Sequence, residues 1–351
     1  MALDERSVPT AEAYLRGLQQ KYGEITRIRW EIPAEDVDWE KLLDDQAFVQ
    51  RLRSVHGDRS RDELRAILMG PPSEADRIRF IARNGLDGLS PHEAAVLRDI
   101  PVGGLPTNDP NAAAIRAPSG DPAVVVNTGM THLLYRCANA LVGSQPTRLT
   151  RAMWSEQQAM IWIVQGCVAM ATGTASVGFE RVPTFTDPLR MTGAASLADC
   201  ATAFIVGHEY GHVQLGHLRG GTVSRLHLLS GLDAPSVEVY QKRHEQEFDA
   251  DRKGAEFAVL FNRQTHRPPS QTVFLAIAFF FQIVRVLDIC AGSSLDRASH
   301  PAAEHRWDRL NAGLRSQYAD TLARDIVQLD QLFDEIRAGA QVISPPRQKN
   351  T

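Results

Sequence analysis

Two histidines and one glutamate in the stretch GHEYGH carry the clearest chemical signal of this 351-residue sequence. His208 and His212 are four residues apart, so on a helix both imidazoles project from one face and can bind the same metal ion. Glu209 lies about 100° round the helix from His208, where its carboxylate can take a proton from a water molecule without being a ligand. The HExxH spacing therefore predicts a zinc site that activates water for hydrolysis.

A zinc site of this kind needs a third protein ligand, and the sequence offers histidine and carboxylate candidates. His217 follows His212 by five residues, which points it away from the ligand face and predicts a supporting or exposed position. Glu247 and Asp251 are four residues apart in HEQEFDAD, so Glu247 can bind the ion while Asp251 accepts a hydrogen bond from a ligand histidine. The alternative for this acidic pair is a solvated stripe along a helix.

The segments that must position these residues are predicted to be helical. Ser196 can cap a helix whose end is marked by Gly220 and Gly221, and this helix would contain the whole HExxH motif. A second helix is expected to start at Pro235 or Ser236 and to carry the acidic pair. Both halves of the metal site would then project from helices.

Prolines and glycines divide the chain into regions. The segment DIPVGGLPTNDPN at 99–111 predicts a loop and a domain boundary. We expect a helical N-terminal region at 1–105 that regulates the site or selects the substrate, a zinc metalloprotease domain at 106–340 and a flexible tail at 341–351. The run PAVVVN at 122–127 predicts a short strand. The predicted fold class is therefore α+β and predominantly helical, with a small β-sheet.

Composition argues against several other classes of protein. The net charge is −4, without the basic excess that is typical of nucleic-acid binders. The four cysteines are far apart and form no CxxC pair, which indicates reduced thiols, and the acidic N-terminus does not resemble a signal peptide. We therefore expect a cytoplasmic protein. The apolar stretch at 272–290 contains Gln282, Arg285 and Asp288, which favours a buried core helix over an integral membrane segment.

The motifs in this order resemble a known family of peptidases. HExxH followed by EFDAD on a later helix is similar to the gluzincin zinc endopeptidases related to HtpX and the CAAX prenyl proteases. The segment DPNAAAIRAPSGDPAVVVNTGM resembles the family's Asn-Ala segment, edge strand and Gly-led helix, and SHPAAEHRWDRL resembles its Ser/Thr-His-Pro motif with a following arginine. The resemblance covers about residues 106–315 and implies a zincin-like domain with an active-site helix and a small sheet.

The resemblance also implies a role for each matching residue at the metal. His208, His212 and Glu247 would bind one zinc ion per chain, and Glu209 would be the general base. Asp251 would orient a ligand histidine.

Three further features of the site are implied in the same way. His300 would stabilise the oxyanion that develops during hydrolysis. Arg306 would brace the acidic residues around the metal. An extended substrate would pair with an edge strand formed by Val124, Val125, Val126 and Asn127.

We therefore expect a zinc-dependent endopeptidase that acts on a protein or peptide substrate. One alternative is a highly specific regulatory or defence metallopeptidase, of the phage-exclusion or repressor-cleaving type, that cuts a single partner protein. The other is a non-enzymatic protein with a structural zinc ion. Glu209 argues against this last alternative, because a closed structural site has no use for a base beside the metal.

Overall fold

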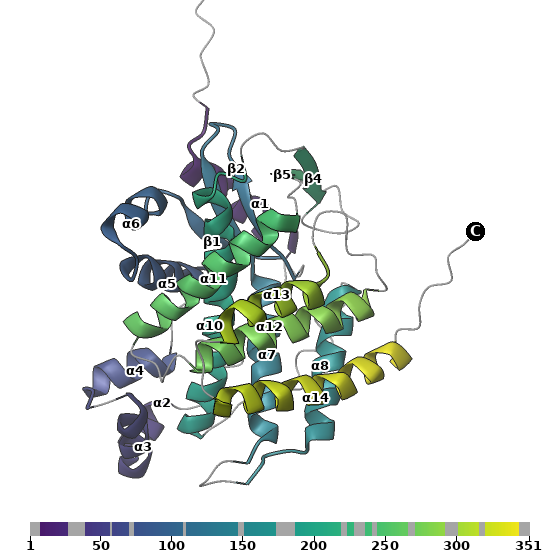
Figure 1. Cartoon of the computed structure of the whole chain (residues 1–351). Helices are drawn as coiled ribbons and strands as arrows, with labels where there is room; N and C mark the ends of the chain where they lie inside the picture. Colours follow the sequence, from purple (N-terminus) through teal and green to yellow (C-terminus); the bar gives the residue numbers. More distant parts are fainter. Residues whose placement is uncertain are drawn as a thin grey trace, which may run out of the picture.

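Helices make up most of the protein and surround one long helix, α10 (Pro188–Gln214), in the computed structural model (Figure 1). The structure describes residues 8–26, 39–56, 58–69, 74–107, 110–146, 151–172, 187–218, 223–227, 236–240, 244–265, 271–291, 301–315 and 320–343. The architecture is α+β and predominantly helical, with a small sheet, which confirms the predicted fold class.

Along the sequence, helices come first, then a sheet, and then further helices interrupted by a two-stranded sheet. The N-terminal helices are α1 (Ala11–Thr26), α2 (Trp39–Asp44), α3 (Gln46–His56), α4 (Arg61–Met69), α5 (Glu74–Asp87) and α6 (Pro91–Leu97). They are followed by β1 (Val102–Leu105), β2 (Ala112–Arg116), β3 (Pro122–Asn127), α7 (Thr128–Ser144) and α8 (Glu156–Ala171). After α10 come β4 (Val223–His227), β5 (Ser236–Tyr240), α11 (His244–Gln264), α12 (Gln271–Cys290), α13 (Ala303–Leu314) and α14 (Asp320–Ile343).

The three-stranded sheet has β3 at its centre. β1 pairs with β3 in parallel and β2 pairs with β3 in the antiparallel direction. The prediction of an edge strand is therefore wrong for the four residues of this central strand, Val124, Val125, Val126 and Asn127. A partner strand lies on each side of them. In this sheet β2 is the edge strand that lies against α10.

Alternate side chains of β3 pack on opposite faces of the sheet. Val124 and Val126 belong to the main core, whereas Val125 packs with Leu15 and Leu18 of α1 on the other face. Because both faces are covered, the strand has no polar side and reads as a continuous apolar run. The sheet thus separates α1 from the helices that carry the chemistry (Figure 1).

The predicted N-terminal region contributes directly to the main core. Ile78 and Ile81 of α5 and Leu97 of α6 are buried in it. Arg77 of α5 also forms an ion pair with Asp199 of α10, with 2.5 Å between Nη2 and Oδ1. These helices therefore support α10, and a regulatory role for residues 1–105 stays a prediction.

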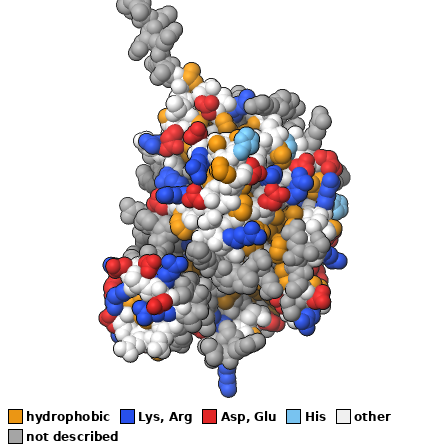
Figure 2. All heavy atoms as spheres, turned by 60° about the vertical axis from the view of Figure 1, so that its left-hand side comes forward, with side chains coloured by type: hydrophobic (Ala, Val, Ile, Leu, Met, Phe, Trp, Pro, Cys, Tyr) orange, Lys and Arg blue, Asp and Glu red, His pale blue; other side chains and the backbone are white. Residues whose placement is uncertain are grey.

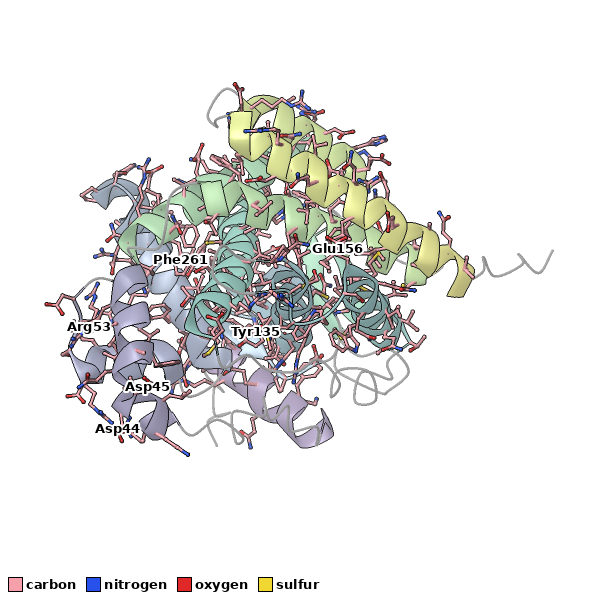
Figure 3. All side chains as sticks on the ribbon, turned by 90° about the horizontal axis from the view of Figure 1, so that it is seen from below. Asp44, Asp45, Arg53, Tyr135, Glu156 and Phe261 are labelled. Atoms are coloured by element: carbon pink, nitrogen blue, oxygen red, sulfur yellow. The ribbon has the colours of Figure 1, made fainter. Side chains whose placement is uncertain are left out.

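Helices α2, α3 and α4 have a small core of their own, made by Leu43, Phe48, Leu52 and Leu64. Figure 3 shows Asp44, Asp45 and Arg53 at one side of the molecule, whereas Tyr135 and Phe261 lie nearer its centre. At the other end of the chain, α14 continues to Ile343, three residues into the predicted tail, and the rest of that tail lies outside the described residues.

Two predicted helix boundaries differ from the structure. α10 begins at Pro188, before Ser196, and ends at Gln214, before Gly220. The second helix begins at His244, and residues 236–240 form β5, which pairs antiparallel with β4. The prediction of a helix from position 236 is wrong because SVEVY alternates in the way that a strand does, and β4 provides the pairing partner.

The most apolar helix lies in the core. Among the described helices, α12 is the one long and apolar enough to cross a membrane, over Thr272–Cys290, and 72% of that window is buried inside the protein. This burial agrees with the predicted core helix. The four cysteines, which all lie in the described residues, form no disulfide, and three of them are buried.

The surface carries charged side chains of both signs and isolated apolar ones. On the face shown in Figure 2, positive and negative side chains are interspersed, in keeping with the net charge of −4. Exposed large apolar side chains such as Phe80, Ile161 and Val327 come from α5, α8 and α14 and are scattered.

Helices α10 and α11 approach each other closely through three glycines. A Cβ on Gly207 would lie 2.4 Å from Cβ of Phe257, and one on Gly211 would lie 2.9 Å from Cβ of Lys253. From the other helix, a Cβ on Gly254 would lie 2.7 Å from the backbone oxygen of Phe204. The absence of side chains at these positions lets the two backbones come together.

We expect Gly254→Ala to destabilise the protein by about 1–3 kcal/mol, the usual cost of overpacking a core. The added Cβ would meet backbone atoms of α10, so the two helices would have to separate. Gly339→Ala in α14 is the matched control, because a Cβ there has nothing within 4 Å and alanine favours a helix. Urea unfolding followed by circular dichroism compares the two, and equal stability would contradict the packing argument.

Candidate metal centre

Three buried side chains from two helices converge on one point. His208 and His212 come from α10 and Glu247 comes from the first turn of α11. The Nε2 atoms of the two histidines are 3.0 Å apart. The Glu247 carboxylate places Oε1 3.3 Å from Nε2 of His212 and Oε2 3.6 Å from Nε2 of His208.

These separations fit a single metal ion. Two ligand atoms that each lie about 2.0–2.2 Å from a tetrahedral zinc ion are about 3.3–3.5 Å from each other. The observed distances, from 3.0 to 3.6 Å, lie around that value, although Glu247 reaches the two histidines through different carboxylate oxygens. Two imidazoles and a carboxylate also match the ligand set of catalytic zinc sites, which leave a fourth position open. The donor group can therefore hold a metal ion without rearranging its helices.

Glu209 lies beside the donor group and is held by the sheet. Its Oε2 accepts a hydrogen bond from the backbone N–H of Ala114 in β2, at 2.6 Å. Its Oε1 is 4.0 Å from Nε2 of His208. One carboxylate oxygen is thus anchored, and the other is directed toward the donors, where it can accept a proton.

Asp251 and Arg306 support the donor group on the side of His208 that faces away from the other donors. Asp251 Oδ1 is 2.9 Å from Nδ1 of His208, the ring nitrogen that faces away from the donor cluster. Arg306 of α13 binds the same carboxylate with two nitrogens, Nε at 2.9 Å from Oδ2 and Nη2 at 2.5 Å from Oδ1. Its Nη1 is also 3.6 Å from Oε2 of Glu247. This is the arrangement that fixes the orientation of a ligand histidine.

The charges of this pair hold both groups ionised. Burial raises the pKa of Asp251, but the charge of Arg306 and the hydrogen bonds from Arg306 and His208 outweigh burial and hold that pKa below its ordinary value. Burial lowers the pKa of Arg306, but Asp251 and Glu247 outweigh it and raise that pKa.

The buried groups of the site carry an excess of negative charge. The carboxylates of Glu209, Glu247 and Asp251 are buried, and Arg306 is the guanidinium that pairs with two of them. With all three carboxylates ionised and the histidines neutral, the single guanidinium of Arg306 would leave a net charge of −2 on these groups. Uncompensated charge is costly in a buried site, and a divalent cation at the donor group would balance it.

The structure brings together most of the residues that the sequence singles out. His208, Glu209, His212, Glu247, Asp251 and Arg306 all lie at the site. His300 lies outside the described residues, so its role stays a prediction. The strand that contacts Glu209 is β2, through Ala114, and the predicted strand β3 lies behind it in the sheet.

The contact of Ala114 is absent from the sequence prediction, whereas the contact of His217 matches the supporting position that is one of its two predicted places. The hydrogen bond from Ala114 involves a backbone group, and the alanine-rich run around it gives no chemical signal. His217 also contacts the site: its Nδ1 is 2.9 Å from Nδ1 of His212. Gly216, directly before it, has a φ of +71° and is the signal for the helix end that brings His217 back to the site.

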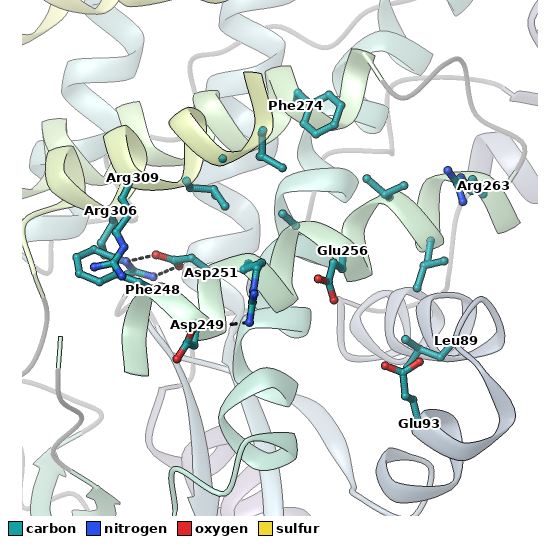
Figure 4. Close-up of a pocket in the computed structure, with 17 residues that line it drawn as sticks. Leu89, Glu93, Phe248, Asp249, Asp251, Glu256, Arg263, Phe274, Arg306 and Arg309 are labelled. Atoms are coloured by element: carbon teal, nitrogen blue, oxygen red, sulfur yellow. Dashed lines mark hydrogen bonds and ion pairs between the residues drawn. The ribbon is translucent and has the colours of Figure 1, made fainter. Parts of the chain in front are cut away.

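A cavity of about 590 Å³ lies next to the Asp251–Arg306 ion pair, between α11, α13 and α6 (Figure 4). Asp251 and Arg306 line it, together with apolar residues such as Phe274 and polar ones such as Glu93. His208, Glu209 and His212 do not line it. The cavity therefore adjoins the supporting ion pair and not the donor atoms.

Comparison with known proteins points to a peptidase. The family model described as Peptidase U49 matches residues 182–324, a segment that contains α10, α11, α12 and α13. The matched segment therefore includes the donor group, Glu209 and the Asp251–Arg306 pair. No curated protein and no solved structure matches the chain at a significant level. The family match supports a protease, and hence a protein or peptide substrate.

We expect Arg306→Met to destabilise the protein by about 3–5 kcal/mol, because removing one partner leaves buried carboxylates uncompensated. Arg309→Met, one turn along α13, removes an exposed ion pair with Glu245 and is expected to change stability little. Urea unfolding of both variants measures the difference. Equal destabilisation would show that the buried ion pair does not brace the site.

Proposed function

We propose that this protein is a zinc-dependent endopeptidase that hydrolyses peptide bonds by direct attack of water. The observation that carries the proposal is the buried donor group of His208, His212 and Glu247, with Glu209 directly beside it. The match to Peptidase U49 over the same helices supports peptidase activity. The donor set supports zinc, because imidazole and carboxylate ligands suit that ion.

The residues around the donor group have separate tasks in this proposal. When bound, zinc would lower the pKa of a water molecule toward about 7 and polarise the attacked carbonyl. Glu209 accepts the proton of that water at Oε1 and returns it to the leaving amine, while Oε2 stays bound to Ala114. Asp251 and Arg306 keep the ring of His208 in place.

Assignment to the gluzincin class is part of this proposal. It is supported by the order of HExxH on α10 and EFDAD on α11, and by the contact of Asp251 with His208. His300 remains the proposed group for stabilising the oxyanion.

Edge strand β2 is the element along which we propose that a substrate lies. It pairs with β3 on one side, and its Ala114 N–H faces Glu209 instead of β3. β5 also contacts β2, so we propose that the peptide lies along β2 beside this contact, with a carbonyl group close to Glu209. Main-chain pairing of this kind recognises an extended conformation, with side-chain pockets adding specificity.

The purified protein is expected to contain about one zinc ion per chain, by analogy with other sites of two histidines and a carboxylate. His208→Ala and Glu247→Ala each remove a donor, so both should lose the metal. Elemental analysis by mass spectrometry measures the zinc content of the three proteins after dialysis. Retention of stoichiometric zinc by both variants would place the ion elsewhere.

Glu209→Gln is expected to keep the metal and to lower hydrolysis by at least about 100-fold, because the amide keeps an acceptor for Ala114 N–H but is not a base. Glu335→Gln, at an exposed position of α14, is the control. New termini in a proteome-derived peptide library measure cleavage for each. A wild-type protein that holds zinc but generates no new termini would favour a structural metal site.

A further inference from the structure

The last turn of α10 ends in a tight reversal of the chain immediately after the second ligand histidine. Gly216 has a φ of +71° and its N–H donates to the carbonyl of Val213 at 3.0 Å. The N–H of His217 donates to the carbonyl of His212 at 2.9 Å. These two bonds define a Schellman motif, in which the residue after the left-handed glycine folds back over the last helical turn.

This reversal brings two imidazole rings into contact. Nδ1 of His217 is 2.9 Å from Nδ1 of His212, and the ring centroids are 5.1 Å apart. In a Schellman motif these two positions usually hold an apolar contact. Here they hold two nitrogen atoms at hydrogen-bond distance, so the contact has a direction and one ring must donate to the other.

The position of His212 decides that direction. It presents Nε2 to the donor group, and a neutral imidazole that binds a metal through one nitrogen carries its proton on the other. In the metal-bound protein Nδ1 of His212 is therefore the donor. Nδ1 of His217 faces it and must be the acceptor, with the His217 proton on its own Nε2.

We propose that His217 is a positioning residue for the metal site: it accepts a hydrogen bond from His212 and fixes the tautomer and ring orientation of that ligand. The proposal rests on the metal centre of the proposed function. His208 has a carboxylate, Asp251, in the corresponding place. A neutral acceptor on His212 supports the second ligand without adding to the negative charge of a site that already contains three buried carboxylates.

Two substitutions separate this role from simple packing. His217→Leu fills similar space and suits the apolar contact of a Schellman motif, but it removes the acceptor. His217→Asn keeps an acceptor, because Oδ1 of asparagine is as many bonds from Cβ as Nδ1 of histidine. A packing role predicts that leucine is tolerated at least as well as asparagine, whereas the positioning role predicts the reverse.

The test measures the affinity for Zn²⁺ by competition with a chelator. All variants carry Glu209→Gln as well, so peptidase activity does not enter the result. We expect His217→Leu to weaken zinc binding by about 10–100-fold, the usual effect of losing such a partner. His217→Asn should stay within about threefold of the Glu209→Gln parent. In the ¹⁵N NMR spectrum of the zinc-bound parent, His212 should be protonated at Nδ1 and His217 should be unprotonated at Nδ1.

Three results would overturn the proposal: unchanged affinity in His217→Leu, equal losses in the leucine and asparagine variants, or a protonated Nδ1 on His217. Each of these leaves a zinc-binding parent and therefore the metal centre intact. A parent that binds no Zn²⁺ would instead overturn the proposed function, and this proposal with it.

Discussion

The close approach of α10 and α11 is the constraint on which the site depends. HExxH on one helix supplies two donors, and the third comes from a different helix, so the distance between the two backbones decides whether the donors meet. Gly207 and Gly211 directly precede His208 and His212, and Gly254 faces them from α11. Glu247 reaches the two histidines because the three glycines let α11 lie close to α10.

The buried negative charge of the site is the second constraint, and Arg306 balances part of it. Glu209, Glu247 and Asp251 are buried within one site, and the guanidinium of Arg306 lies against two of them. Such a concentration of carboxylates would normally be unfavourable. A cation held by the donor group would complete the balance, and its binding would then stabilise this part of the fold.

Local spacing explains what could be predicted from the sequence. His208, His212, Glu247 and Asp251 are related by the periodicity of single helices, and they lie where that periodicity puts them. The place of β3 depends on pairing with β1 and β2, which no local pattern specifies. SVEVY likewise depends on its partner β4. In the sequence Gly254 only lowers helix propensity, and its role in packing is visible only once α10 lies against it. The sequence prediction places the end of α10 at Gly220, whereas Gly216 has the positive φ that ends it.

The hydrogen bond between Ala114 and Glu209 has a consequence for how the sequence of this site can change over time. The donor is a backbone N–H, so any residue except proline at this position can supply it. Ala114 is buried, so packing limits which side chains fit here, but any residue that fits keeps the Glu209 carboxylate in its orientation. The orientation of Glu209 is thus encoded in the backbone of β2 and not in the identity of the residue at position 114.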